Sequence, residues 1–374
     1  MNLSLSNSSS KKARIIAFYL PQYHPIEEND QWWGKGFTEW TNVTKAKPLF
    51  PGHHQPNLPA DLGFYDLRVP ETRIAQAQLA QEYGIEGFCY WHYWFGNGRR
   101  LLERPLREVI DSGKPDFPFC LAWANHSWTG IWLGSPDKIL LEQTYPGKAD
   151  YKEHFEAVLH AFKDPRYLTV DGKPIFVVFA PYDLPNPREF TDYWQELSRE
   201  YGLPGIYFVG MSFSLSWDHH ADGFDALTTH PPKDVINRFN YQNRQVPGQR
   251  INQILQNKLK QLMGIPRRYN YKQLIDYMIP SVAEELNFLP NIVPNWDNTP
   301  RSGSEGFVLL DSTPEQFKKV LEKAFRVIYH KPKEEKIIFI KAWNEWAEGN
   351  YLEPDSQWNK GYLEALQLFL LEDD

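Results

Sequence analysis

Two glutamates near the C-terminus, Glu345 and Glu348, lie in the segment Trp-Asn-Glu-Trp-Ala-Glu-Gly that covers residues 343–349. They are three residues apart, so a continuing strand would point them to opposite faces. In a turn or a first helical turn, the same spacing brings the side chains together, with Cβ atoms about 5–6 Å apart. If the strand predicted from the preceding apolar run stops near Trp343, both carboxylates can converge on one substrate.

A pair of carboxylates beside aromatic rings is what the chemistry of a glycosidic bond requires, because one group donates a proton and the other serves as base or nucleophile. The segment also supplies Trp343, Asn344 and Trp346 as possible sugar contacts. The alternative is that both glutamates are surface residues of a loop. Two tryptophans and an asparagine interleaved with them favour a site, so we predict that Glu345 and Glu348 are catalytic.

The composition points to a carbohydrate ligand rather than a nucleic acid. Aromatic residues make up 15% of the 374 residues, including 14 Trp. So many tryptophans suit a carbohydrate site, since the C–H faces of sugars stack on rings that carry a polar handle. The net charge is −7 and no basic block occurs, so we expect no nucleic-acid partner. The sequence leaves the oligomeric state open.

Three features bear on location. No stretch approaches the ~20 apolar residues of a membrane span. Residues 1–12 are rich in Ser and Asn and lack an apolar core, which indicates a disordered lead-in rather than a secretory signal. Cys89 and Cys120 lie in apolar segments without metal-ligand spacing, which predicts buried free thiols in a reducing compartment. Together these features favour a cytoplasmic protein.

Short apolar runs recur along the chain, and their near-continuous apolarity is typical of strands buried on both faces. We predict eight strands, at residues 14–20, 86–91, 117–124, 175–179, 206–211, 226–229, 291–294 and 336–342. Helical patterns separate most of them, at residues 71–83, 101–112, 151–162, 187–201, 314–329 and 360–371.

Alternating strands and helices predict parallel βα units, and eight such units predict an α/β fold of the (β/α)8 or TIM-barrel type. A typical barrel takes ~250 residues. The excess predicts two insertions, residues 21–70 after strand one and residues 230–289 between strands six and seven. We expect residues 13–374 to form a single catalytic domain. An open doubly wound sheet is the competing architecture, but it would not require eight strands.

Polar and aromatic residues follow almost every predicted strand. In this barrel the chemistry takes place at the C-terminal face, on residues just past the strands. We therefore predict a substrate-binding set at the strand ends and in the first insertion: Tyr23, His24, Glu39, Trp40, His92, Tyr93, Trp94, Asn125, His126, Trp128, His230, Trp296, Asp297, Arg301, Trp343, Asn344 and Trp346.

Several of these residues have structural alternatives. Trp40 could anchor the first insertion on the barrel, and His92 and His126 could be satisfied structural histidines. Asp297 and Arg301 could pair as a salt bridge that orders their loop. A catalytic metal is not expected, because no His-x-x-x-His or His-Glu-x-x-His spacing occurs and the His-His pair at 219–220 is a weak signal. No cofactor is predicted either.

Two further segments resemble a known family. Residues 18–25, Phe-Tyr-Leu-Pro-Gln-Tyr-His-Pro, and residues 32–40, Trp-Trp-Gly-Lys-Gly-Phe-Thr-Glu-Trp, resemble the WbsX-like proteins of bacterial polysaccharide gene clusters. The resemblance covers residues 15–366, including 296–298 and 343–349. Those proteins are in turn similar to glycoside hydrolase family 99, the endo-acting α-mannosidases and α-mannanases, through the barrel fold and the W-N-E-W-x-E-G motif.

The resemblance implies a role for each glutamate. Glu345 matches the family 99 base that acts on the sugar 2-hydroxyl, which then attacks the anomeric carbon and gives net retention. Glu348 matches the general acid, whose pKa should be raised by an apolar, like-charged neighbourhood. The resemblance thus implies a glycoside hydrolase that cleaves an α-linked, mannan-like or bacterial surface polysaccharide.

Two departures from the family pattern leave alternatives open. Family 99 has His at the position of Ala347, and many WbsX-like proteins have Glu at the position of His126. WbsX-like proteins are also described as glycosyltransferases, although this sequence has no Asp-x-Asp and no Gly-rich turn entering a helix. The rival functions are therefore a glycosyltransferase of O-antigen or exopolysaccharide synthesis and a non-catalytic glycan-binding barrel.

Overall fold

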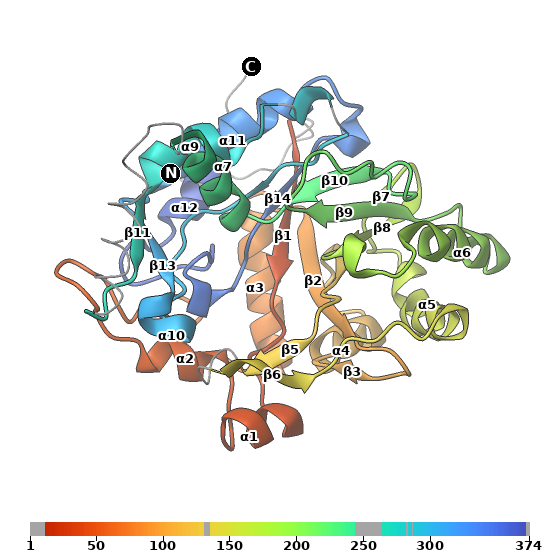
Figure 1. Ribbon diagram of the computed structural model, residues 1–374, viewed down its shortest axis with the longest axis horizontal. Coiled ribbons are helices and arrows are strands. Elements are labelled where there is room, and N and C mark those ends of the chain that lie inside the picture. Colours follow the sequence, from red (N-terminus) through yellow and green to blue (C-terminus); the bar gives the residue numbers. More distant parts are fainter. Residues whose placement is uncertain (1–11, 131–134, 244–262, 282, 286, 372–374) are drawn as a thin grey trace.

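The computed structural model describes residues 12–130, 135–243, 263–281, 283–285 and 287–371, and its centre is a parallel sheet wound into a barrel (Figure 1). The expected lead-in, residues 1–12, lies almost wholly outside these residues. All eight predicted strands are present: β1 (Arg14–Tyr19), β2 (Gly87–Trp94), β4 (Phe119–Trp123), β8 (Lys173–Val178), β9 (Tyr207–Ser212), β10 (Ala226–Thr229), β12 (Asn291–Ile292) and β14 (Ile337–Ile340).

The strand order confirms the predicted barrel. The sheet runs β10-β9-β8-β4-β2-β1-β14-β12, and each neighbouring pair in this order is parallel. Between the two ends of the sheet, Leu227 of β10 makes a parallel bridge with Phe288, just before β12. The sheet is therefore nearly closed. Cys89 and Cys120 are partners in register and are buried free thiols, as predicted.

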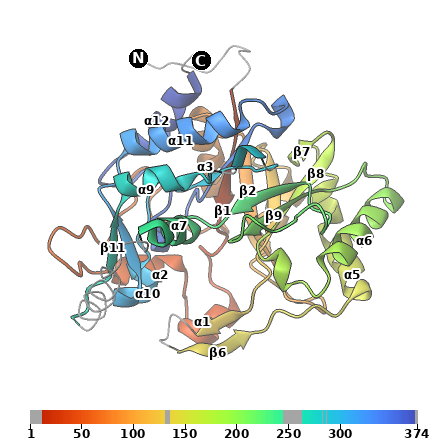
Figure 2. The same cartoon turned by 45° about the horizontal axis from the view of Figure 1, so that its top comes forward.

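Strand residues are buried because helices cover the outside while side chains fill the inside. In β1, β2, β4 and β14 every residue but Arg14 is buried. The six predicted helices are present: α3 (Pro70–Glu82), α4 (Arg104–Ser112), α5 (Lys148–Phe162), α6 (Pro187–Glu200), α11 (Pro314–Ile328) and α12 (Gly361–Leu371). They lie around the sheet in Figures 1 and 2.

Helix α11 shows why these segments fold as they do. Thr313 caps it by accepting the backbone N–H of Gln316 over 3.3 Å, and Pro314 occupies the first turn, where its missing N–H costs nothing. Phe317, Val320 and Leu321 then recur at the helical spacing and are fully buried. The apolar face of this helix packs onto the barrel.

The first insertion and three smaller elements lie at the end of the barrel where the strands end. The insertion forms α1 (Glu27–Trp33) and α2 (Glu39–Lys45). The hairpin β5 (Trp128–Gly130) and β6 (Ser135–Leu141) follows β4, and the short α10 (Thr299–Ser302) follows β12. In Figure 1 the arrow of β1 points toward this group. We call this end the mouth of the barrel.

The second insertion begins after β10, as predicted. Its described part contains α7 (Lys233–Asn243), β11 (Arg267–Asn270), α9 (Tyr271–Met278) and the 3₁₀ turn η3 (Ala283–Glu285). Strand β11 pairs in parallel with β13 (Phe307–Leu310), outside the barrel. Further short elements are β3 (Arg100–Leu101), β7 (Thr169–Val170), and the 3₁₀ turns η2 (Pro181–Asp183), η4 (Gly303–Glu305), η5 (Lys333–Glu335) and η6 (Trp346–Glu348).

Candidate active site

The two predicted catalytic glutamates lie in one tight turn after β14. The strand ends at Ile340, and the 3₁₀ turn η6 follows. Within it, the backbone N–H of Glu348 donates to the carbonyl of Glu345 over 3.1 Å. The chain thus leaves the extended conformation before Glu345, which is the condition under which the i,i+3 spacing brings the two side chains together.

Gly349 ends this turn, and both its conformation and its surroundings require glycine. Its φ is +67°, in the left-handed region. A Cβ there would lie 2.7 Å from the backbone nitrogen of Asp297. The two backbones come this close because they are hydrogen-bonded: the N–H of Asp297 donates to the carbonyl of Glu348 over 2.7 Å. The turn is therefore joined directly to the loop after β12.

Buried polar side chains fix the turn against the end of β1. The Asn344 amide accepts the N–H of Leu20 over 2.7 Å and donates to the Leu20 carbonyl over 3.0 Å. The hydroxyl of Tyr23 donates to the carbonyl of Asn344 and accepts the N–H of Trp346 over 3.2 Å. Asn344 and Tyr23 therefore position the backbone that carries the glutamates.

A further carboxylate, Glu353, supports the turn from within the core. It accepts hydrogen bonds from the Trp346 indole at 2.6 Å, the Tyr65 hydroxyl at 2.9 Å and the Gln76 amide at 2.6 Å. Burial raises the pKa of Glu353 to about 7, against the opposing effect of these donors. Sequence analysis missed this residue, since its position gives no signal until Trp346 is known to be buried.

Arg301 brings three carboxylates together. Its Nη1 lies 2.7 Å from Oε1 of Glu348 and 3.7 Å from Oε1 of Glu345. Its Nη2 lies 3.0 Å from Oε2 of Glu39. The guanidinium side chain is 10% exposed and Glu39 is fully buried. The first insertion, the loop after β12 and the turn after β14 therefore meet at one buried cluster.

Lys341 is a second cation in this cluster, and sequence analysis missed it. Its Nζ lies 3.4 Å from Oε2 of Glu348, 3.9 Å from Oε2 of Glu345 and 5.0 Å from the centroid of the Trp296 ring. It comes directly after Ile340. A charged residue at the C-terminal end of a buried barrel strand is the signal that could have revealed it.

The protonation of the pair differs from the sequence expectation. Burial, followed by the charge of Glu348, raises the pKa of Glu345 to about 7. The pKa of Glu348 is lowered: burial opposes this, but the charges of Lys341 and Arg301 outweigh it. The prediction of a raised pKa for Glu348 was wrong for the ligand-free protein, because two cations contributed by distant segments lie against this carboxylate. Below pH 7, one proton on Glu345 and a charged Glu348 describe the resting pair.

Several predicted substrate-binding residues are saturated by contacts within the protein. Asn125 donates to the Ala180 carbonyl and accepts its N–H, both over 2.8 Å. One carboxylate oxygen of Asp297 accepts hydrogen bonds from His53 at 2.7 Å and from Gln55 at 2.6 Å. The other oxygen accepts a hydrogen bond from the Thr299 hydroxyl. Such carboxylates and amides hold the loops of the mouth in place.

Most of the other predicted aromatic and histidine residues are buried within the protein. His92 and His154 hydrogen-bond through their Nε2 atoms at 2.8 Å, and Trp94 stacks on His154. The remaining residues of this group are buried in the core, namely His24, Trp40, Trp296, Trp343 and Trp346. The contacts of Trp40 match its alternative role as an anchor of the first insertion, since its indole N–H donates to the Tyr65 carbonyl over 2.8 Å.

Partly exposed residues lie beside the cluster. Trp128 is partly exposed and packs against Tyr93 and Trp32, with ring centroids 5.2 and 5.9 Å apart. Burial and then the charge of Glu345 raise the pKa of Tyr93, which places its hydroxyl near the cluster. His126 is also partly exposed, and His230 is 5% exposed. Among the predicted residues, His126, Trp128 and Arg301 are the partly exposed ones at the mouth, whereas Glu39 and Tyr93 are buried beside them.

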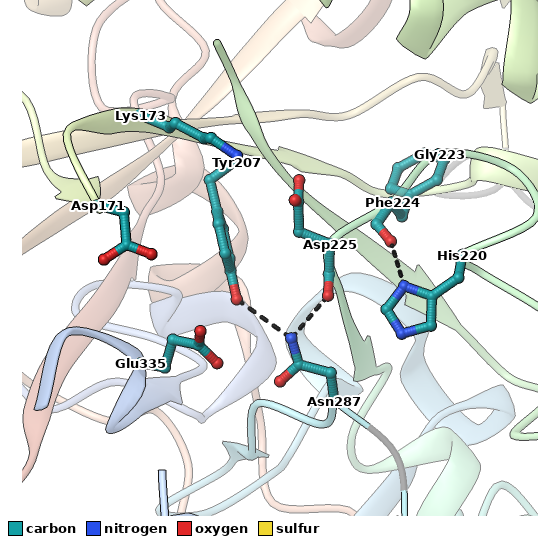
Figure 3. A pocket seen from close by; sticks show the side chains of 9 residues that line it. All are labelled: Asp171, Lys173, Tyr207, His220, Gly223, Phe224, Asp225, Asn287 and Glu335. Carbon is teal, nitrogen blue, oxygen red and sulfur yellow. Dashed lines mark hydrogen bonds between the residues drawn. The ribbon is translucent and has the colours of Figure 1, made fainter. Parts of the chain in front are cut away.

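A pocket of about 350 Å³ lies away from this cluster (Figure 3). Lys173, Tyr207 and Asp225, which line it, stand at the beginnings of β8 and β9 and just before β10. It therefore lies at the N-terminal end of the barrel, which we call the base. In this barrel fold the base serves stability and the mouth serves chemistry, so we take the mouth as the candidate site.

The described part of the chain contains no group of three or more His, Cys, Asp or Glu residues arranged to hold a metal ion. None of the helices described there is long and apolar enough to cross a membrane.

Two solved structures with a similar fold are a glycoside hydrolase-like protein and a glycoside hydrolase. A glycoside hydrolase-like protein matches with a TM-score of 0.62 and 13% identity, over 98% of this chain and 96% of that one. The GH99 endo-alpha-mannosidase from Bacteroides thetaiotaomicron matches with a TM-score of 0.55 and 14% identity, over 95% of this chain and 96% of that one. At these identities the likeness shows the TIM-barrel fold.

Sequence similarity to curated relatives and to a family model shows the family of this chain. The chain is 37% identical over 362 residues to the uncharacterized protein WxcX of Xanthomonas campestris pv. campestris, from strain B100 and from strain ATCC 33913. That alignment covers 94% of this chain and 49% of each relative, so the chain spans about half their length. The model described as glycosyltransferase WbsX matches residues 15–366. The chain therefore belongs to the WbsX family.

Proposed function

We propose that this protein acts on a glycosidic bond at the mouth of its barrel, and that Glu345 and Glu348 carry the reaction. The observation that supports this most is their joint contact with one nitrogen of Arg301, at 3.7 and 2.7 Å. Two carboxylates so close together, one protonated and one ionised, supply the acid and the base that the reaction needs. The fold shared with glycoside hydrolases is consistent with this function.

The specific reaction that we propose is hydrolysis of an α-linked, mannan-like or bacterial surface glycan with retention through the sugar 2-hydroxyl. Glu345 would take the proton of that hydroxyl, and Glu348 would protonate the leaving oxygen. In the resting protein the proton is on Glu345 instead. This assignment therefore requires substrate binding to move one proton from Glu345 to Glu348.

Three changes of the substrate and the enzyme test these roles. With Glu348 as the acid, Glu348→Gln should lose turnover of substrates with poor leaving groups far more than turnover of activated aryl glycosides. Glu345→Gln should lose both equally, and a 2-deoxy substrate should bind without turnover. The opposite pattern for the two variants would show that Glu345 is the acid and would overturn the assignment. Rates and product anomers by NMR provide the measurement.

Transfer from an activated sugar is the second candidate, favoured by the description of the family as glycosyltransferase WbsX. The cations Lys341 and Arg301 beside the glutamates would suit the diphosphate of a glycosyl donor. An assay that offers a nucleotide-sugar with an acceptor glycan separates the two. Product formation that consumes the nucleotide-sugar supports transfer, whereas product formed from glycan and water alone supports hydrolysis. Glycan binding with neither product would indicate a non-catalytic barrel.

A further inference from the structure

Two histidines at the mouth flank one aromatic ring. Phe179 follows β8, and its ring centroid lies 4.9 Å from that of His126 and 4.6 Å from that of His230. Nδ1 of His126 and Nε2 of His230 are buried atoms without a hydrogen-bond partner among the residues that the structure describes. A buried polar atom without a partner costs free energy, so these nitrogens are suited to the polar groups of a ligand.

Both histidines are neutral near neutral pH. Burial, followed by the charges of Lys233 and Lys341, lowers the pKa of His126 to about 4. Burial, followed chiefly by the charge of Lys341, lowers the pKa of His230 to about 3. A neutral imidazole keeps one N–H donor and one acceptor nitrogen. Each ring can therefore bind a hydroxyl or an anionic oxygen without adding a charge of its own.

Two lysines give this group a positive field. Nζ of Lys341 lies 3.4 Å from Oε2 of Glu348, and its charge also acts on both histidines. Lys233 is exposed and begins α7, three residues after His230. Burial raises the pKa of Glu348, but the charge of Lys233 lowers it together with those of Lys341 and Arg301. The neighbouring acid Asp234 does not offset Lys233 fully, because it pairs with Arg238 at 2.8 Å.

The charges of the mouth do not balance in the resting state. Arg301, Lys341 and Lys233 are positive. Even with Glu39 and Glu348 both ionised against Arg301, protonation of Glu345 below its pKa of about 7 leaves one of these cations in excess. An anion that entered beside Lys233 and Lys341 would therefore meet a net attraction that a neutral sugar would not.

We propose that His126, His230, Lys233 and Lys341 form a subsite for an anionic group of the saccharide, a carboxylate or a phosphate, next to the bond that Glu345 and Glu348 act on. This inference rests on the proposed function for its position beside the reacting bond. A carboxylate would come from a uronic acid. A phosphate would come from a phosphorylated glycan or from the diphosphate of a sugar nucleotide.

Titration of the full chain, labelled with ¹⁵N at histidine, tests this subsite by NMR. The probes are glucuronic acid, mannose 6-phosphate and inorganic phosphate, with glucose and mannose as neutral controls. The imidazole resonances of His126 and His230, assigned by His→Gln variants, should shift with the anionic probes, at concentrations at least tenfold below those that the neutral sugars require. Tighter binding of glucuronic acid than of mannose 6-phosphate identifies a carboxylate site, and the reverse identifies a phosphate site.

Comparing Lys233→Gln with a matched control variant separates a local effect of Lys233 on anion binding from a general effect of the lost charge. Lys233→Gln should weaken anion binding about tenfold, whereas Lys319→Gln, an equal charge change at an exposed position of α11, should not. If no anionic probe moves the two resonances, or if both variants weaken binding equally, the subsite is wrong. The proposed function fails by a different result, namely unchanged turnover in Glu345→Gln and Glu348→Gln, so the two can be distinguished.

Discussion

The mouth and the base of the barrel both contain carboxylates and lysines, but they hold them differently. At the mouth, Glu345 and Glu39 are buried and the Glu348 side chain is 17% exposed, and each of the three lies against Arg301 or Lys341. At the base, the charged residues that line the pocket in Figure 3 are more exposed: Asp171 and His220 are exposed, and Lys173 and Asp225 are partly exposed.

The hydrogen bonds at the base indicate a structural role for this region. Asn287 donates to the Asp225 carbonyl at 2.7 Å and to the Tyr207 hydroxyl at 3.4 Å, and both bonds are drawn in Figure 3. Asp225 in turn accepts the N–H of Phe208 at 2.8 Å. These contacts join the beginnings of strands. The comparison teaches that a polar pocket alone does not indicate chemistry, whereas several charged groups that shift one another's pKa values at the C-terminal ends of barrel strands do.

We expect the largest difference between the two regions when a cation is removed from each and the free energy of unfolding is measured. Arg301→Met should lower the free energy of unfolding by about 3–5 kcal/mol, because it leaves buried carboxylates without their countercharge. Lys173→Met at the base, where the side chain is only partly buried, should change it by less than about 0.5 kcal/mol. Urea unfolding near pH 7 measures both. Equal losses would show that the two clusters do not differ in the way described here.

A smaller effect concerns protonation at the mouth. Glu345 has a folded-state pKa of about 7, above its ordinary value of 4.5. Its contribution to stability is therefore fully present below pH 4.5 and is lost as the pH rises to 7. The free energy of unfolding of the wild type, relative to Glu345→Gln, should fall across this window, by at most about 1.4 kcal/mol per pH unit.

Glu348 should show the opposite sign. Because its pKa is lowered, its contribution to stability is present above pH 4.5 and is lost as the pH falls through its folded-state pKa. Unfolding curves of the wild type and of Glu348→Gln between pH 3 and 5 should therefore converge as the pH falls. If the two variants instead showed the same pH dependence, the assignment of the proton to Glu345 would be incorrect.

The fold and the position of the catalytic turn could be predicted from sequence because both depend on local patterns. Eight apolar runs indicated the strands, and the Glu345–Glu348 spacing after such a run indicated the turn. Gly349 fits the same local logic, since the turn requires a positive φ.

The electrostatics of the site could not be predicted because they depend on distant segments. Arg301 comes from the loop after β12 and Glu39 from the first insertion, and only the folded barrel places them against Glu348 and Glu345. For the same reason Asn125 and Asp297 could be recognised as polar residues at strand ends, but not as residues saturated by Ala180, His53 and Gln55.

Turnover of glycans by matched glutamate variants tests the central claim most directly, namely that the chemistry belongs to the mouth and not to the base. Glu345→Gln and Glu348→Gln remove one carboxylate each from the mouth, and Glu335→Gln removes one from the pocket at the base. With a glycan that the wild type converts, we expect both mouth variants to lose about 10²–10⁴-fold in rate and Glu335→Gln to keep the wild-type rate. A loss in Glu335→Gln as large as in the mouth variants, or full activity in both mouth variants, would contradict the claim.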